Sequence, residues 1–146
     1  MRYFPPAAVI FAVLCALPIP SRSAEPPMPA SKPDVKKEVV AVIEAQLTAF
    51  RKGDPAKAYT YAAADLRAQK PLRIFSAIVK DNYPEIWANL RAEFGIVRDD
   101  GKRATVTVQV YSKQTDAAYD FTLVKENAGW RIYGVVRHEP KSSGKV

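Results

Sequence analysis

The sequence contains little of the chemistry on which most metal and catalytic sites depend. Its 146 residues include one cysteine and one histidine, which excludes a disulfide framework and a zinc site built from cysteine and histidine. No glycine-rich phosphate loop, nucleophile elbow or EF-hand pattern occurs. The 22 basic and 15 acidic residues are spread without runs of like charge, which argues against nucleic-acid binding. We therefore expect no metal, no cofactor and no nucleic-acid partner.

The N-terminal residues are typical of an export signal. Arg2 supplies a positive charge, residues 7–17 form an uncharged apolar run, and small residues follow at Ser21 and Ser23. The run is too short to cross a bilayer as a helix. We expect residues 1–23 to be a cleaved signal peptide, which leaves a secreted, periplasmic protein with no transmembrane segment. An uncleaved membrane anchor is the alternative.

A proline-rich stretch separates this signal from the folded part. Residues 24–33 carry four prolines, and proline lacks the backbone N–H that a helix interior requires. We predict that residues 24–33 form an extended tether. The remaining length suits one domain, which we assign to residues 34–140, followed by a polar tail at residues 141–146.

The first half of this domain is predicted to be helical. Apolar residues recur at three- and four-residue steps between residues 35 and 50, with Asp34 as the N-cap. Gly53 is expected to end this helix with a positive φ, and Asp54-Pro55 begins a second helix that reaches residue 64. A third helix is predicted from Pro71 to about residue 82.

The second half alternates with the period of β-strands. Apolar and polar residues alternate over residues 88–96, 105–111, 119–123 and 130–136, with turn signals between them. If the apolar residues of each strand face the helices, Leu90, Ile96 and Val136 point inward. Helices on one face of a four-stranded antiparallel sheet make an α+β domain. One core should hold the aromatic residues of this phase: Phe50, Phe75, Phe94, Phe121 and Trp130.

The strand residues between these apolar positions, Arg137 among them, are predicted to form the outer face of the sheet. We expect this face to pair two copies of the chain as a homodimer. The face mixes Tyr, Val, Thr and Arg, which is typical of a protein contact surface. A monomer with β-prone residues on its outer strands is the alternative. The predicted interface residues are Tyr111, Val124, Tyr133 and Val135.

Short motifs across residues 43–135 resemble a small bacterial family known only as domain of unknown function 4864. They are Gln46-Leu47-x-Ala49-Phe50, Gly53-Asp54-x-Ala56-x-Ala58-Tyr59, Tyr83-Pro84 and Gly129-Trp130-Arg131-Ile132. The chain departs from the family pattern at Lys70-Pro71, where an apolar or aromatic residue is expected. The family is itself similar to the nuclear transport factor 2-like superfamily, which implies a curved sheet wrapped around helices as a cone with an internal pocket.

The resemblance leaves three functions open. The leading hypothesis is a non-enzymatic module that binds a small apolar ligand or a protein partner. The second is a cone-pocket isomerase, cyclase or hydrolase, in which a buried Asp65 acts as base with Tyr59 or Tyr83 as hydrogen-bond donor. The third is an electrostatic binder of the anionic cell envelope. The expected pocket residues are Tyr59, Tyr83, Phe94 and Trp130.

Overall fold

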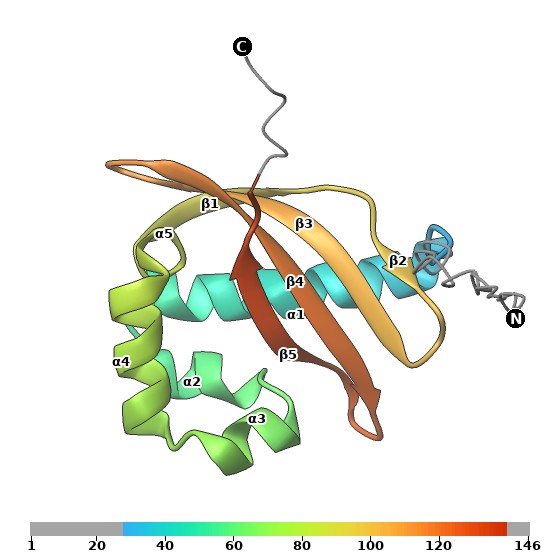
Figure 1. Ribbon diagram of the computed structural model, residues 1–146, viewed down its shortest axis with the longest axis horizontal. Helices are drawn as coiled ribbons and strands as arrows, with labels where there is room; N and C mark the ends of the chain where they lie inside the picture. The colour runs from blue at the N-terminus through green and yellow to red at the C-terminus, as the bar shows by residue number, and fades with distance from the viewer. Residues whose placement is uncertain (1–27, 140–146) are drawn as a thin grey trace, which may run out of the picture.

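The structure, a computed structural model, describes residues 28–139. The predicted signal peptide and C-terminal tail lie outside these residues. Helices come first and strands follow, which confirms the α+β class (Figure 1). The elements are α1 (Pro33–Arg51), α2 (Pro55–Thr60), α3 (Ala64–Gln69), α4 (Leu72–Asn82), α5 (Pro84–Trp87), β1 (Asn89–Phe94), β2 (Arg98–Asp99), β3 (Arg103–Ser112), β4 (Asp116–Glu126) and β5 (Gly129–Arg137).

The long helix α1 begins slightly earlier than its sequence pattern suggests. Lys32 is the N-cap and Pro33 occupies the first helical turn, so the prediction that Asp34 is the N-cap is wrong. Proline fits there because the first N–H groups of a helix have no intrahelical partner. Asp34 instead places its negative charge in the first turn, where the helix dipole favours it.

The break between α1 and α2 follows the prediction. Gly53 has a φ of +72°, and the Asp54 carboxylate accepts a hydrogen bond of 3.0 Å from the Lys57 N–H. α2 ends at Thr60 rather than near residue 64. The chain then forms two helices that the sequence pattern did not predict, α3 and α5, with six and four residues. Helices this short contain too few turns to display a hydrophobic period.

The strands form one curved antiparallel sheet in the order β1-β3-β4-β5, with the short β2 paired to β3. Alternate residues of β3 and β4 are buried on the face that α1 covers, while α2, α3 and α4 gather beside β5 (Figure 1). Phe50, Phe75, Phe121 and Trp130 share this core, as predicted, and Phe94 packs half-buried against it. No helix in residues 28–139 is long and apolar enough to cross a membrane.

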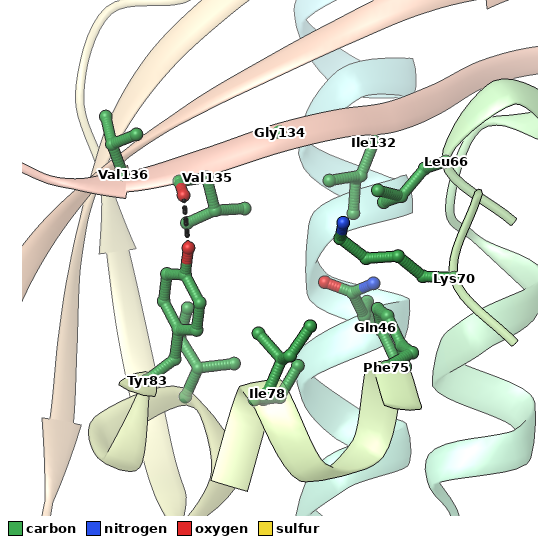
Figure 2. A pocket seen from close by; sticks show the side chains of 12 residues that line it. Gln46, Leu66, Lys70, Phe75, Ile78, Tyr83, Ile132, Gly134, Val135 and Val136 are labelled. Carbon is green, nitrogen blue, oxygen red and sulfur yellow. Dashed lines mark hydrogen bonds between the residues drawn. The ribbon is translucent and has the colours of Figure 1, made fainter. Parts of the chain in front are cut away.

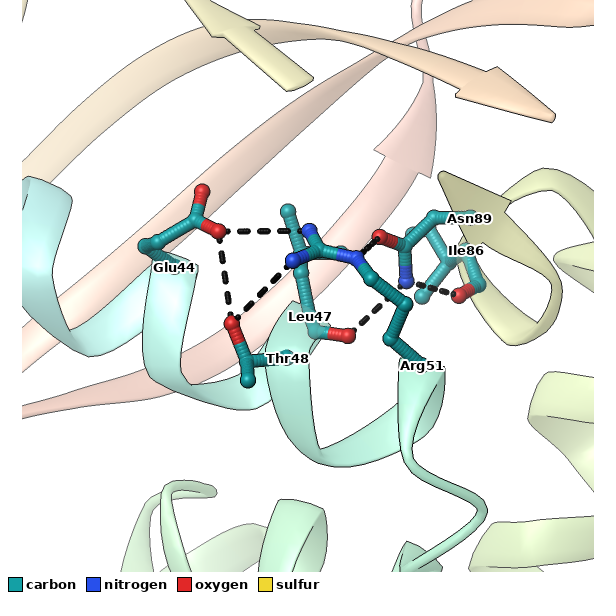
Figure 3. Close-up of polar contacts among 6 residues, drawn as sticks. All are labelled: Glu44, Leu47, Thr48, Arg51, Ile86 and Asn89. Atoms are coloured by element: carbon teal, nitrogen blue, oxygen red, sulfur yellow. Dashed lines mark hydrogen bonds and ion pairs between the residues drawn. The ribbon is translucent and has the colours of Figure 1, made fainter. Parts of the chain in front are cut away.

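β1 begins with a buried asparagine, and the residue after it points to the opposite face from the one predicted. Asn89 donates to the carbonyls of Leu47 and Ile86, at 2.9 and 2.8 Å, and accepts from Arg51 Nε at 2.9 Å (Figure 3). This residue therefore joins α1 and α5 to the sheet. The register shifts between Asn89 and residue 91, so Leu90 points outward and is 50% exposed.

The inward assignments at the ends of β1 and β5 are also wrong. Ile96 lies beyond β1 and is 63% exposed, and Val136 is 62% exposed. The register of β5 shifts opposite Thr122 and Leu123, because a bulge adds one residue and exchanges the two faces of the strand beyond it.

Because of this bulge, two residues that were predicted on the outer face of the sheet lie on its inner face. Val135 pairs with the fully buried Phe121, so Val135 lies on the inner face. Arg137 pairs with Tyr119 and also turns inward. The prediction that Val135 and Arg137 belong to the outer face is therefore wrong.

The described part of the proline-rich stretch makes hydrogen bonds with β2. Ser31 N–H donates to the Val97 carbonyl at 2.8 Å, and Asp99 N–H donates to the Pro29 carbonyl at 3.2 Å. Ala30 forms a bridge with Arg98. Residues 28–31 thus run extended beside β2, where they satisfy backbone groups that would otherwise be exposed at a sheet edge.

Candidate functional site

An apolar pocket lies between α4, α1 and the β5 edge of the sheet. Its volume is about 240 Å³, which lies between an apolar cavity that holds benzene, roughly 150 Å³, and the usual sites for drug-sized ligands. Figure 2 shows side chains from several elements converging on it. The lining residues are Gln46, Leu66, Lys70, Phe75, Ile78, Val79, Tyr83, Ile86, Ile132, Gly134, Val135 and Val136.

Gln46 brings an amide into this apolar wall. The residue is only 4% exposed, and its Nε2 donates to the Ala58 carbonyl at 3.2 Å, which ties α1 to α2. That hydrogen bond requires the nitrogen to face Ala58, and Figure 2 shows the amide oxygen turned toward the pocket. The pocket therefore contains a fixed hydrogen-bond acceptor.

Lys70 is the one charged residue that lines the pocket. It caps the C-terminal end of α3 and is half-buried. Its side chain extends along the pocket, on the same side as Gln46 and Ile132 (Figure 2). Within residues 28–139, Lys70 takes part in none of the ion pairs. A cation and an acceptor therefore share one end of a cavity that is otherwise largely apolar.

Two predicted pocket tyrosines hold the walls in place. The Tyr59 hydroxyl lies 2.6 Å from the Lys70 carbonyl and 3.0 Å from the Arg67 carbonyl, so it anchors the chain segment that carries Lys70. Tyr83 lines the pocket itself, and its hydroxyl donates to the Val135 carbonyl at 2.8 Å (Figure 2). That contact ties the end of α4 to the β5 edge.

Of the predicted site residues, only Tyr83 belongs to the pocket lining, and Tyr59, Asp65, Phe94 and Trp130 lie outside it. Asp65 is exposed in the first turn of α3. Phe94 packs half-buried against the core on β1. Trp130 is 2% exposed, and its indole N–H has no hydrogen-bond partner within the described residues. The structure therefore does not bring Asp65 together with the phenol of Tyr83 at the pocket.

A buried carboxylate, which the sequence pattern did not single out, lies where α5 meets β4 and β5. Glu85 is 5% exposed and accepts hydrogen bonds from Tyr119 at 2.6 Å, Arg137 at 2.9 Å and Thr115 at 2.7 Å. Burial raises the pKa of Glu85, but the hydrogen bonds from Tyr119 and Thr115 outweigh it, so the pKa is lowered. Burial and the bond to Glu85 raise the pKa of the Tyr119 phenol.

Three hydrogen bonds already occupy most of the acceptor capacity of the buried Glu85 carboxylate. Each oxygen of Glu85 already accepts from a hydroxyl, and the Arg137 guanidinium balances its charge. A general base needs a lone pair free for substrate and a pKa near the working pH. Glu85 is therefore suited to joining elements rather than to proton abstraction.

The outer face of the sheet carries its own polar contacts. The Tyr111 hydroxyl donates to Glu93, and the Arg91 guanidinium lies 3.9 Å from the Tyr111 ring centre. Thr107 donates to Asp120, whose carboxylate also contacts His138 at 2.9 Å. Tyr133 is 41% exposed, and Val124 is half-buried opposite Arg103. The homodimer through this face stays a prediction.

The sequence analysis did not identify Gln46 and Lys70 as pocket residues, although each occupies an unusual position in the sequence. Gln46 lies on the apolar stripe of α1, where an amide is out of place unless it has a buried partner. Lys70 stands at the departure from the expected apolar or aromatic pattern. Neither signal by itself places the two side chains together, since α1 and α3 meet only in the folded domain.

Residues 32–144 match a family described as a domain of unknown function, DUF4864. No curated protein sequence and no solved structure gives a significant match. The family match spans most of the chain, including α1, the pocket walls and the whole sheet. The chain therefore belongs to the DUF4864 family.

Proposed function

We propose that this protein is a non-enzymatic module that binds a small apolar ligand in the pocket between α4 and β5. The observation that carries the proposal is the lining, which is mostly aliphatic and aromatic and includes no carboxylate. Apolar walls with a few placed polar groups are typical of small-molecule sites. The enzyme alternative requires a base in the pocket, and Asp65 is exposed on α3 instead.

The arrangement of the sheet supports the likeness to the nuclear transport factor 2-like architecture. A curved sheet lies over α1, and shorter helices stand beside its β5 edge (Figure 1). The pocket lies where these helices and the sheet meet. We propose that this protein shares with that superfamily a cone formed by the curved sheet and its helices, and that the pocket is the functional part of the cone. A shared fold supplies no activity.

Ile78 offers a direct test of the pocket. Ile78 points into it from α4, while Ile74, one turn earlier on the same helix, is 39% exposed and lies outside the lining (Figure 2). Ile78→Phe should fill the cavity and weaken binding of 1-octanol at least fivefold by isothermal titration calorimetry. Ile74→Phe should leave that affinity unchanged. Equal affinity in Ile78→Phe and the parent protein would contradict the proposal.

We also propose that the protein acts outside the cytoplasm. The support is the order of a positive start, a short apolar run and small residues within residues 1–23. Intact-mass measurement on the exported protein should find an N-terminus between residues 22 and 25. Retention of Met1, or a lipid on Cys15, would contradict cleavage at this place.

A further inference from the structure

We propose that the pocket selects an apolar molecule that ends in a carboxylate, with Lys70 as its counter-ion. This inference rests on the proposed function and assigns a chemical class to its ligand. The volume of about 240 Å³ suits a molecule of roughly ten non-hydrogen atoms, scaled from the cavity that holds benzene. A medium-chain or aryl-alkyl acid has this size and carries one charge at one end.

Lys70 brings a positive charge into the pocket without an acidic partner among residues 28–139. It is the one charged lining residue, it is half-buried, and it joins no ion pair within residues 28–139. Lys125, by comparison, pairs with Glu38 at 3.7 Å on the surface. An ammonium group beside apolar side chains has lost part of its hydration, which a bound anion would replace. The pocket thus has a positive end that a neutral apolar ligand would leave uncompensated.

Gln46 marks the same end as the polar end. Its Oε1 faces the pocket on the same side as Lys70, while the rest of the side chain is buried and its Nε2 donates to the Ala58 carbonyl (Figure 2). An ammonium group has three N–H donors, and a ligand carboxylate can accept from them. The amide and the cation together make this the polar end of the pocket.

The opposite end of the pocket has no such groups. Ile78, Tyr83 and Val135 lie there, and the Tyr83 hydroxyl already donates to the Val135 carbonyl (Figure 2). Apolar atoms of a ligand gain about 25 cal/mol per Å² of surface that they bury. The two ends together orient a ligand with its carboxylate at Lys70 and its chain toward α4.

Octanoate and 1-octanol have the same chain length and differ in charge, so comparing their affinities measures the contribution of the carboxylate. Calorimetric titration of the exported protein at pH 7.5 should show octanoate binding about two- to fivefold tighter than octanol, the upper part of the range for partly exposed charge pairs. Lys70→Met keeps the aliphatic stem and should abolish this preference, so that octanoate binds no tighter than octanol. Lys80→Met, at an exposed position of α4 outside the lining, should retain the preference.

The outcomes distinguish the two proposals. Equal affinity for octanoate and octanol in the parent protein, or a preference that survives in both Lys70→Met and Lys70→Gln, would overturn the role of Lys70 and leave the apolar pocket standing. Absence of binding by both probes would overturn the proposed function together with this inference. Raising NaCl from 50 to 500 mM should also reduce octanoate affinity and not octanol affinity, a readout that needs no variant.

Discussion

Replacing Glu85 by glutamine tests whether the buried carboxylate joins α5 to the sheet through its charge. Glutamine keeps the shape of the side chain but removes the charge that strengthens three hydrogen bonds. The Tyr119 phenol is fully buried, so its bond dominates, whereas Arg137 is 44% exposed and its ion pair is screened by water. A charged acceptor is worth about 1 kcal/mol more per bond than a neutral one. We expect a loss of about 2 kcal/mol at pH 7.

Urea unfolding followed by circular dichroism measures this loss. With a slope of about 2 kcal/mol per molar urea, the midpoint should fall by about 1 M. Glu93→Gln is the matched control, because Glu93 also accepts from a tyrosine and an arginine but lies exposed on the outer face. We expect no resolvable change in Glu93→Gln. Equal midpoint shifts in the two variants would refute the argument from burial.

The pH dependence provides a second test of Glu85. The pKa of the folded-state carboxyl is lowered from the ordinary value of 4.5, so the folded protein binds this proton more weakly than the unfolded chain. The carboxylate therefore stabilises the fold fully at pH 7, and this contribution is lost as the pH falls below about 5 and through the folded-state pKa. The stability difference between parent and Glu85→Gln should shrink between pH 7 and pH 3. A constant difference would contradict the assignment.

Three further predictions follow from the fold. Gly53→Val should destabilise the domain by about 1 kcal/mol or more, because Gly53 has a φ of +72° that β-branched residues resist; an unchanged urea midpoint would contradict this. Phe121→Ala should cost about 3–5 kcal/mol, and Phe94→Ala about 1–2 kcal/mol because Phe94 is half-buried; equal losses would show that the burial of the two rings is misassigned. Sedimentation equilibrium should find a dimer that Tyr133→Asp dissociates without unfolding the protomer, and a monomer at about 100 μM in the parent protein would refute the homodimer.

The sequence by itself determined that helices precede strands, and it determined most of the core. Val106, Val108 and Val110 alternate so regularly that β3 could be placed with the correct face inward, and its turn neighbours followed from glycine and aspartate. Gly53 and Asp54 likewise marked the break between α1 and α2, because a left-handed glycine and an N-cap act within a few residues. Local signals of this kind need no partner elsewhere in the chain.

Tertiary structure alone decided the face of Val135 and the assembly of the pocket. The bulge in β5 depends on how that strand pairs with β4, and a shift of one residue exchanges the two faces without any change in local propensity. Gln46 and Lys70 come from helices separated by a glycine break and a further helix, and they meet only because α1 and α3 pack beside the same strand. The reason is physical: strand register and side-chain convergence are long-range properties, set by packing between segments rather than by the residues of one segment.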